Sequence, residues 1–173
     1  MATTEVPTDA DEKTTLLASL QRHRDVVLWK LEGLDDEQLR RPVVPSGTNL
    51  IGLVKHLANA EYGWFCETFG RPTEPLTDIS ADLEADMRAA DGETTEDIVA
   101  FYRRAWAASD ASILQTPLET TGTSYSGATV SMRWVLVHMI EDTARHCGHL
   151  DLARELIDGA TGFVDRSGGS PAP

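Results

Sequence analysis

Four long segments of the chain place apolar residues three or four positions apart, which is the spacing of one face of an α-helix. They span residues 11–34, 48–69, 95–114 and 130–159. Polar loops with proline or glycine separate them, and no segment shows the alternating pattern of a half-buried strand. Because each helix must bury its apolar face, the sequence predicts an all-α protein, an antiparallel four-helix bundle with long loops.

Length and charge limit the class of protein and its partners. The chain has 173 residues, 41% of them hydrophobic, so we expect a single domain at residues 11–160 between disordered tails at 1–10 and 161–173. The formal net charge of −13 argues against binding to nucleic acid or to an anionic membrane. No membrane span, secretory signal or disulfide framework is predicted, so we expect a cytoplasmic protein.

The fourth predicted helix contains a polar stretch, HMIEDTARHCGH at residues 138–149, with three of the five histidines. At 100° per residue, one face of this helix is apolar except at Asp142 and His146. A buried carboxylate without a partner costs on the order of several kcal/mol, so something should compensate this pair. Two residues four positions apart can bind one metal ion. A buried Asp–His hydrogen bond that only orders the core is the alternative, and the spacing leaves both open.

A third metal ligand must come from another helix, and the spacing does not select it. His56 flanks the inward stripe of the second helix, and His23 of the first helix is equally ambiguous; either is also a candidate core histidine. His138 lies about 12 Å along the helix axis from His146, too far to share an ion. His149 is about 10 Å from the carboxylate of the pair, so we expect it in a pocket wall or next to a ligand.

Two motifs, LVKHLANAEYGWF in the second helix and VLVHMIEDTARHCGHLDLAREL in the fourth, resemble the DinB-like superfamily of four-helix metalloproteins. Within it they are similar to the branch of mycothiol S-transferases and mycothiol-dependent isomerases. The resemblance implies a divalent metal bound by His56, Asp142 and His146, and it selects His56 where spacing does not. The chain departs from the pattern at Asp142, where that branch often has glutamate, and at His149, where many members have glutamine.

The donor set indicates what such a site could do. Two imidazoles and one carboxylate leave open positions on a metal ion, which is typical of catalytic sites. Zinc is the expected ion, and nickel, iron, cobalt or manganese also suit these donors. The resemblance implies a metal-dependent transferase that activates a low-molecular-weight thiol, mycothiol, as a metal-bound thiolate for conjugation to an electrophilic small molecule. The alternatives are a mycothiol-dependent isomerase, a metal hydrolase, or a non-catalytic metal-binding protein of the stress response.

The long polar loop before the fourth helix is a candidate binding loop. We expect Tyr125 and Arg133 to offer hydrogen bonds to a sugar-like thiol, although both could be ordinary surface residues. Trp64 is expected in the pocket wall or the core, and His149 is a further candidate for binding the substrate. Cys147 is not expected to be a nucleophile, because the sequence supplies no base or positive group for it. Apolar helical faces also allow a homodimer, without specifying which face.

Overall fold

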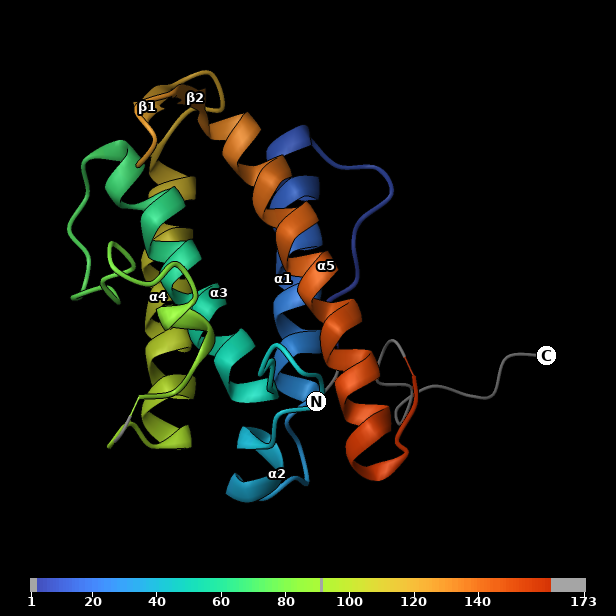
Figure 1. The fold of residues 1–173 in the computed structure, drawn as a ribbon. Coiled ribbons are helices and arrows are strands. Elements are labelled where there is room, and N and C mark those ends of the chain that lie inside the picture. The colour runs from blue at the N-terminus through green and yellow to red at the C-terminus, as the bar shows by residue number, and fades with distance from the viewer. Residues whose placement is uncertain (1–2, 91, 163–173) are drawn as a thin grey trace.

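The computed structural model describes residues 3–90 and 92–162, which contain four long helices packed as a bundle (Figure 1). The long helices are α1 (Glu12–Trp29), α3 (Leu50–Phe65), α4 (Thr95–Gln115) and α5 (Met132–Asp158). The shorter elements are α2 (Asp36–Arg40), the 3-10 helices η1 (Glu67–Phe69) and η2 (Ala85–Met87), and strands β1 (Thr121–Thr123) and β2 (Thr129–Ser131). The predicted all-α four-helix bundle is confirmed. Most of the predicted C-terminal tail, from residue 163 on, lies outside the described residues, as do residues 1–2.

The long helices begin at side chains that accept hydrogen bonds from their own first turns. Asn49 Oδ1 accepts from the backbone N–H of Gly52 at 2.8 Å. Thr94 Oγ1 accepts from the backbone N–H of Asp97 at 3.1 Å. These caps satisfy donors that a first turn leaves unpaired. The cap at Asn49 fixes where α3 begins and so places His56 in its second turn.

Two predicted helices are shorter than the sequence suggested. The first, predicted at 11–34, is α-helical only to Trp29, because the backbone N–H groups of Leu31, Glu32 and Leu34 donate to the third preceding residue and not to the fourth. The second, predicted at 48–69, is α-helical to Phe65 and then tightens into η1. Apolar periodicity continues through such turns, so the pattern alone does not locate the end of the helix.

The loop before α5 contains a small β-hairpin, so the expectation of no strand was wrong. β1 and β2 pair antiparallel, with Gly122 opposite Val130. A Cβ at Gly122 would lie 2.1 Å from the carbonyl oxygen of Thr68, so glycine lets the hairpin pack directly against η1. Strands of three residues, most of them polar, are too short to show an alternating pattern.

The core brings α3 and α5 side by side. α3 packs against both α4 and α5, and α5 also packs against α1 (Figure 1). Fully buried apolar side chains of α3 and α5 fill these contacts: Leu50, Ile51, Leu53, Val54, Leu57, Val135, Leu136, Met139 and Leu150. α3 and α5 run in opposite directions, so residues late in α3 meet residues early in α5.

A buried ion pair joins three of the helices. Arg24 of α1 donates two hydrogen bonds of 2.7 Å to the carboxylate of Glu61 on α3. It donates another of 2.7 Å to Asp110 on α4. Arg24 and Glu61 are both fully buried, so each charge depends on the other for compensation. The network therefore fixes the height of α3 relative to α1 and α4.

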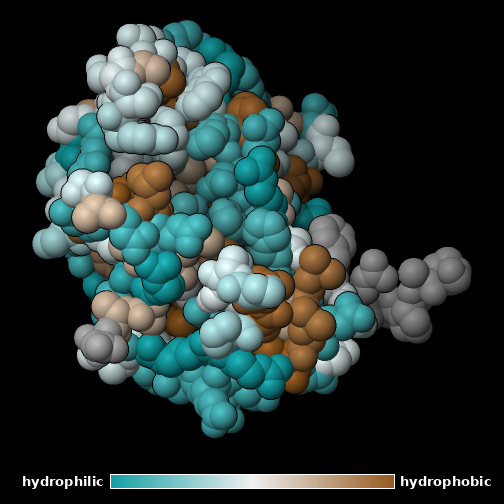
Figure 2. All heavy atoms as spheres, viewed as in Figure 1, coloured by the Kyte–Doolittle hydropathy of each residue, from teal (hydrophilic) through white to brown (hydrophobic). Residues whose placement is uncertain are grey.

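The surface is largely hydrophilic in the view of Figure 2, with an apolar area over the C-terminal half of α5. Leu152 and Leu156 are exposed in this part of the helix. The predicted homodimer stays a prediction, and this area is one face on which it could form. Within residues 3–90 and 92–162, no helix combines the length and the apolar character needed to cross a membrane.

Candidate metal centre

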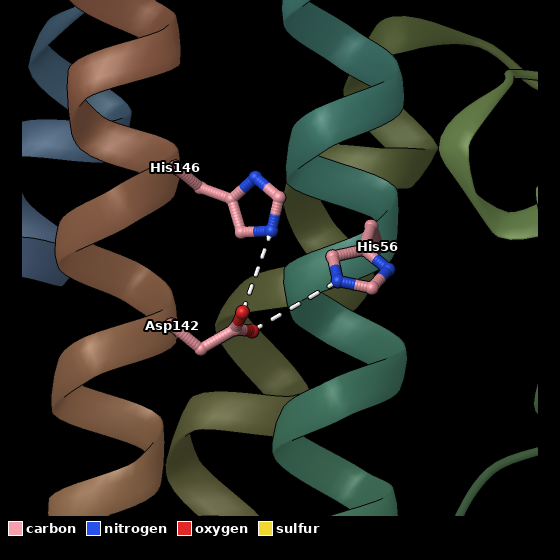
Figure 3. Close-up of side chains that lie close together, drawn as sticks. All are labelled: His56, Asp142 and His146. Atoms are coloured by element: carbon pink, nitrogen blue, oxygen red, sulfur yellow. Dashed lines mark ion pairs between the residues drawn. The ribbon is translucent and has the colours of Figure 1, made fainter.

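α3 and α5 bring together three side chains whose ligand atoms all lie within 4.8 Å of one another: His56, Asp142 and His146. Figure 3 shows both imidazoles turned toward the carboxylate between them. His56 Nε2 is 3.9 Å from Asp142 Oδ2, and His146 Nε2 is 3.6 Å from Asp142 Oδ1. We call these three residues the triad. It unites the Asp–His pair expected on one helix with the ligand that the family resemblance selected on another.

The distances within the triad suit a shared ion better than direct hydrogen bonds. Separations of 3.6 and 3.9 Å exceed the length of an N–H···O hydrogen bond. Ligand atoms about 2.1 Å from a tetrahedral ion lie about 3.4 Å from one another, close to the spacing here. Asp142 and His146 therefore do not form the direct hydrogen bond that the alternative, a pair that only orders the core, requires.

The far ring nitrogen of each triad histidine has a partner. His56 Nδ1 lies 2.9 Å from Asp86 Oδ2, and His146 Nδ1 lies 3.3 Å from His149 Nδ1. A ring whose Nδ1–H donates outward presents the lone pair of Nε2 inward, as a metal ligand needs. His149 thus lies beside His146, and its expected role next to a metal ligand stays a prediction. Asp86 was missed, because nothing in the acidic stretch between α3 and α4 distinguishes it.

Electrostatics give the two histidines different proton affinities. Burial disfavours the charged ring of His146 and lowers its pKa to about 4, although the charge of Asp142 opposes this shift. For His56 burial also lowers the pKa, but the hydrogen bond and charge of Asp86, with the charge of Asp142, outweigh it and raise the pKa. His146 is therefore neutral at pH 7, which is the form that binds metal.

The triad is reachable from solvent. The side chain of His56 is 27% exposed, that of Asp142 19% and that of His146 10%. Ions in closed structural sites have four protein ligands, whereas catalytic sites keep an exchangeable position. Three candidate ligands at a partly exposed point between two helices fit the open type.

Comparison with known proteins identifies the family of the chain. A family model described as mycothiol S-transferase matches residues 15–159. The chain belongs to this family. The family is DinB-like, so the resemblance seen in the two helical motifs is confirmed. A crystal structure titled as a conserved protein of a locus from Enterococcus faecalis is similar in fold, with a TM-score of 0.64 and 15% identity over 88% of this chain and 100% of that one. A search of the curated proteins gave no match.

In this mycothiol S-transferase family member, four rings cluster at the hairpin end of the same two helices. The ring of His138 contacts Trp64 at 4.6 Å between centroids and stacks on Trp134 at 5.0 Å. Trp64 also contacts Tyr125 at 5.8 Å. We call these four residues the ring cluster. His138 lies two helical turns from His146, about 12 Å along the axis, so the ring cluster is outside the triad.

Two further predicted residues have different surroundings. Arg133 donates to Glu12 Oε1 at 2.6 Å and to Glu119 Oε1 at 2.7 Å, so its guanidinium is bound to two carboxylates at the surface. Its expected hydrogen bond to a thiol would have to compete with both. Cys147 is buried, its Sγ lies 3.4 Å from the carbonyl oxygen of His23, and burial raises its pKa to about 12. A thiol with so high a pKa is a poor nucleophile.

Proposed function

We propose that this protein is a metal-dependent transferase that conjugates mycothiol, a low-molecular-weight thiol, to an electrophilic small molecule. The observation that carries the proposal is the partly exposed triad, in which two Nε2 atoms and one carboxylate converge. Membership of the mycothiol S-transferase family supports the identity of the thiol. Zinc is the ion that these donors suit first, and nickel, iron, cobalt and manganese are compatible with them.

The donor set favours activation of a thiol. A divalent ion held here by two neutral imidazoles and one carboxylate would keep one net positive charge, and it would lower the pKa of a thiol that bound to it. His146, neutral at pH 7, would hold the ion without needing to lose a proton. In the transfer, the thiol proton goes to solvent and a carbon–sulfur bond forms. The leaving group of the electrophile departs with the electrons of the broken bond.

The body of the thiol is assigned to the surface between the triad and the ring cluster. His56, Ala60 and Trp64 follow one another at intervals of four along α3, so one ridge connects the two sites. Trp134 is 48% exposed and Tyr125 is 88% exposed, so their rings are available to a ligand. Flat aromatic faces pack well against the apolar faces of sugar-like rings.

The test is to incubate the zinc-loaded protein with mycothiol and chlorodinitrobenzene, and to detect the thioether by mass spectrometry and released chloride. We expect metal-dependent product formation that is lost in Asp142→Ala. Glu141→Ala is the matched control, because Glu141 is the exposed neighbour on the same helix and should keep full activity. Product formation that persists without metal, or in Asp142→Ala, would contradict the proposal. If the protein instead hydrolysed an ester, a hydrolase would be favoured. If it instead isomerised a cis double bond with the help of the thiol, an isomerase would be favoured.

A further inference from the structure

Among the described residues of the connection between α3 and α4, Asp86 carries a carboxylate that is buried beside the triad. Asp86, on η2, is only 7% exposed, while Asp78, Asp82 and Glu84 of the same connection are exposed. Burial of a carboxylate is costly unless a hydrogen bond or charge compensates it. The compensating group is Nδ1 of His56, 2.9 Å from Asp86 Oδ2. This contact joins an irregular segment to a residue of the triad.

The segment is held in place by α3 itself. A Cβ at Gly52 would lie 1.9 Å from the carbonyl oxygen of Met87, so any side chain there would displace η2. We call this close contact between Gly52 and the backbone of Met87 the notch. Gly52 precedes His56 by four residues, so the notch lies one helical turn from the imidazole. On the next residue of the connection, the carbonyl oxygen of Arg88 accepts a hydrogen bond of 3.1 Å from Lys55 Nζ. Asp86 is therefore fixed by backbone contacts that do not involve His56.

We propose that Asp86 is a positioning residue of the metal centre. The η2 turn, whose backbone packs against Gly52, holds its carboxylate so that it accepts the Nδ1–H of His56 and fixes the tautomer and ring orientation that present Nε2 to the ion. The inference rests on the metal site proposed above. A partner on the far nitrogen of a ligand histidine sets which nitrogen carries the proton, and its loss typically weakens metal binding 10–100-fold.

The experiment measures zinc affinity, by competition with a chromogenic chelator, in the full-length protein. We expect Asp86→Ala to weaken binding by about 10–100-fold and Asp86→Asn, which keeps one acceptor oxygen, to weaken it less. Gly52→Ala should weaken binding as well, although it leaves the carboxylate intact. Glu84→Ala, an exposed residue of the same connection, is the control and should bind zinc as wild type does.

A second readout needs no metal. Long-range ¹⁵N–¹H spectra of the histidine-labelled apo protein should show His56 protonated at Nδ1 in wild type and a mixture of tautomers in Asp86→Ala. Wild-type affinity and an unchanged tautomer in a folded Asp86→Ala variant would overturn this inference alone. Failure of the wild-type protein to bind zinc would overturn the proposed site, and this inference with it.

Discussion

Replacement of Asp142 by alanine separates a metal ligand from a residue that only orders the core. In the structure its oxygens lie 3.6 Å and 3.9 Å from the two histidine Nε2 atoms, too far for direct hydrogen bonds. Removing the carboxylate from the apo protein therefore breaks no hydrogen bond within the triad. We expect the free energy of unfolding of the apo Asp142→Ala variant to lie within about 1 kcal/mol of the wild-type value, because large losses of stability come from buried groups left unpaired.

The metal-loaded protein should respond in the opposite way. An ion present at one hundred times its dissociation constant stabilises the folded state by about 2.7 kcal/mol. In a domain of this size each kcal/mol shifts Tm by about 2–4 °C, so zinc should raise the Tm of wild type by about 5–10 °C. Asp142→Ala should show little of this rise, because it removes the only charged ligand of the triad.

The assay is thermal unfolding followed by circular dichroism, with zinc titrated into apo protein. Asp142→Asn, which keeps one neutral oxygen, should give an intermediate shift, and Glu141→Ala should give the full one. A drop of more than about 3 kcal/mol in the unfolding free energy of apo Asp142→Ala would refute the assignment of Asp142 as a metal ligand, because such a drop is expected of a buried structural partner. A full zinc-induced shift in Asp142→Ala would refute it equally.

Three further predictions follow from other parts of the structure. Cys147→Ser should keep most of the activity. Because burial raises the pKa of Cys147 to about 12, about one molecule in ten thousand carries the thiolate at pH 8. Alkylation of Cys147 by iodoacetamide should therefore be slow, and its rate should rise about tenfold per pH unit up to pH 10. Glu61→Gln should lower the unfolding free energy in urea by about 3–5 kcal/mol, because it leaves the buried charge of Arg24 without its main partner. Trp64→Ala should raise KM for the thiol by about tenfold, equivalent to about 1.4 kcal/mol of lost ring contact, with unchanged zinc content measured in the same sample. Rapid alkylation, an unchanged urea midpoint or an unchanged KM would contradict the respective statement.

The sequence was sufficient for the bundle and for two of the three residues of the triad. Helical periodicity marks all four long helices, and Asp142 with His146 interrupts an apolar stripe visible in the sequence. The helical spacing of the residues could not select His56 over His23 as the third member of the triad. The rotation and height of one helix against another depend on packing across the core, and only the family resemblance supplied that information.

Contacts between residues far apart in the chain could not be predicted from the sequence. Asp86 reaches His56 because Gly52 admits the backbone of η2, and neither the notch nor the 3-10 turn has a periodic signal. Arg133, expected either to contact the thiol or to be an ordinary surface residue, is bound to Glu12, which lies 121 residues away in the chain. Partners so distant in sequence become neighbours only once the helices have packed.

The central claim is tested most directly by elemental analysis of purified, untagged protein beside the His146→Ala variant. We expect about one divalent metal ion per chain in wild type and little bound metal in the variant, because two ligands hold an ion far less well than three. Absence of metal from the wild-type protein, even after reloading with zinc or nickel, would contradict the account. Equal metal content in the two proteins would contradict it as well, because His146 would then not be a ligand.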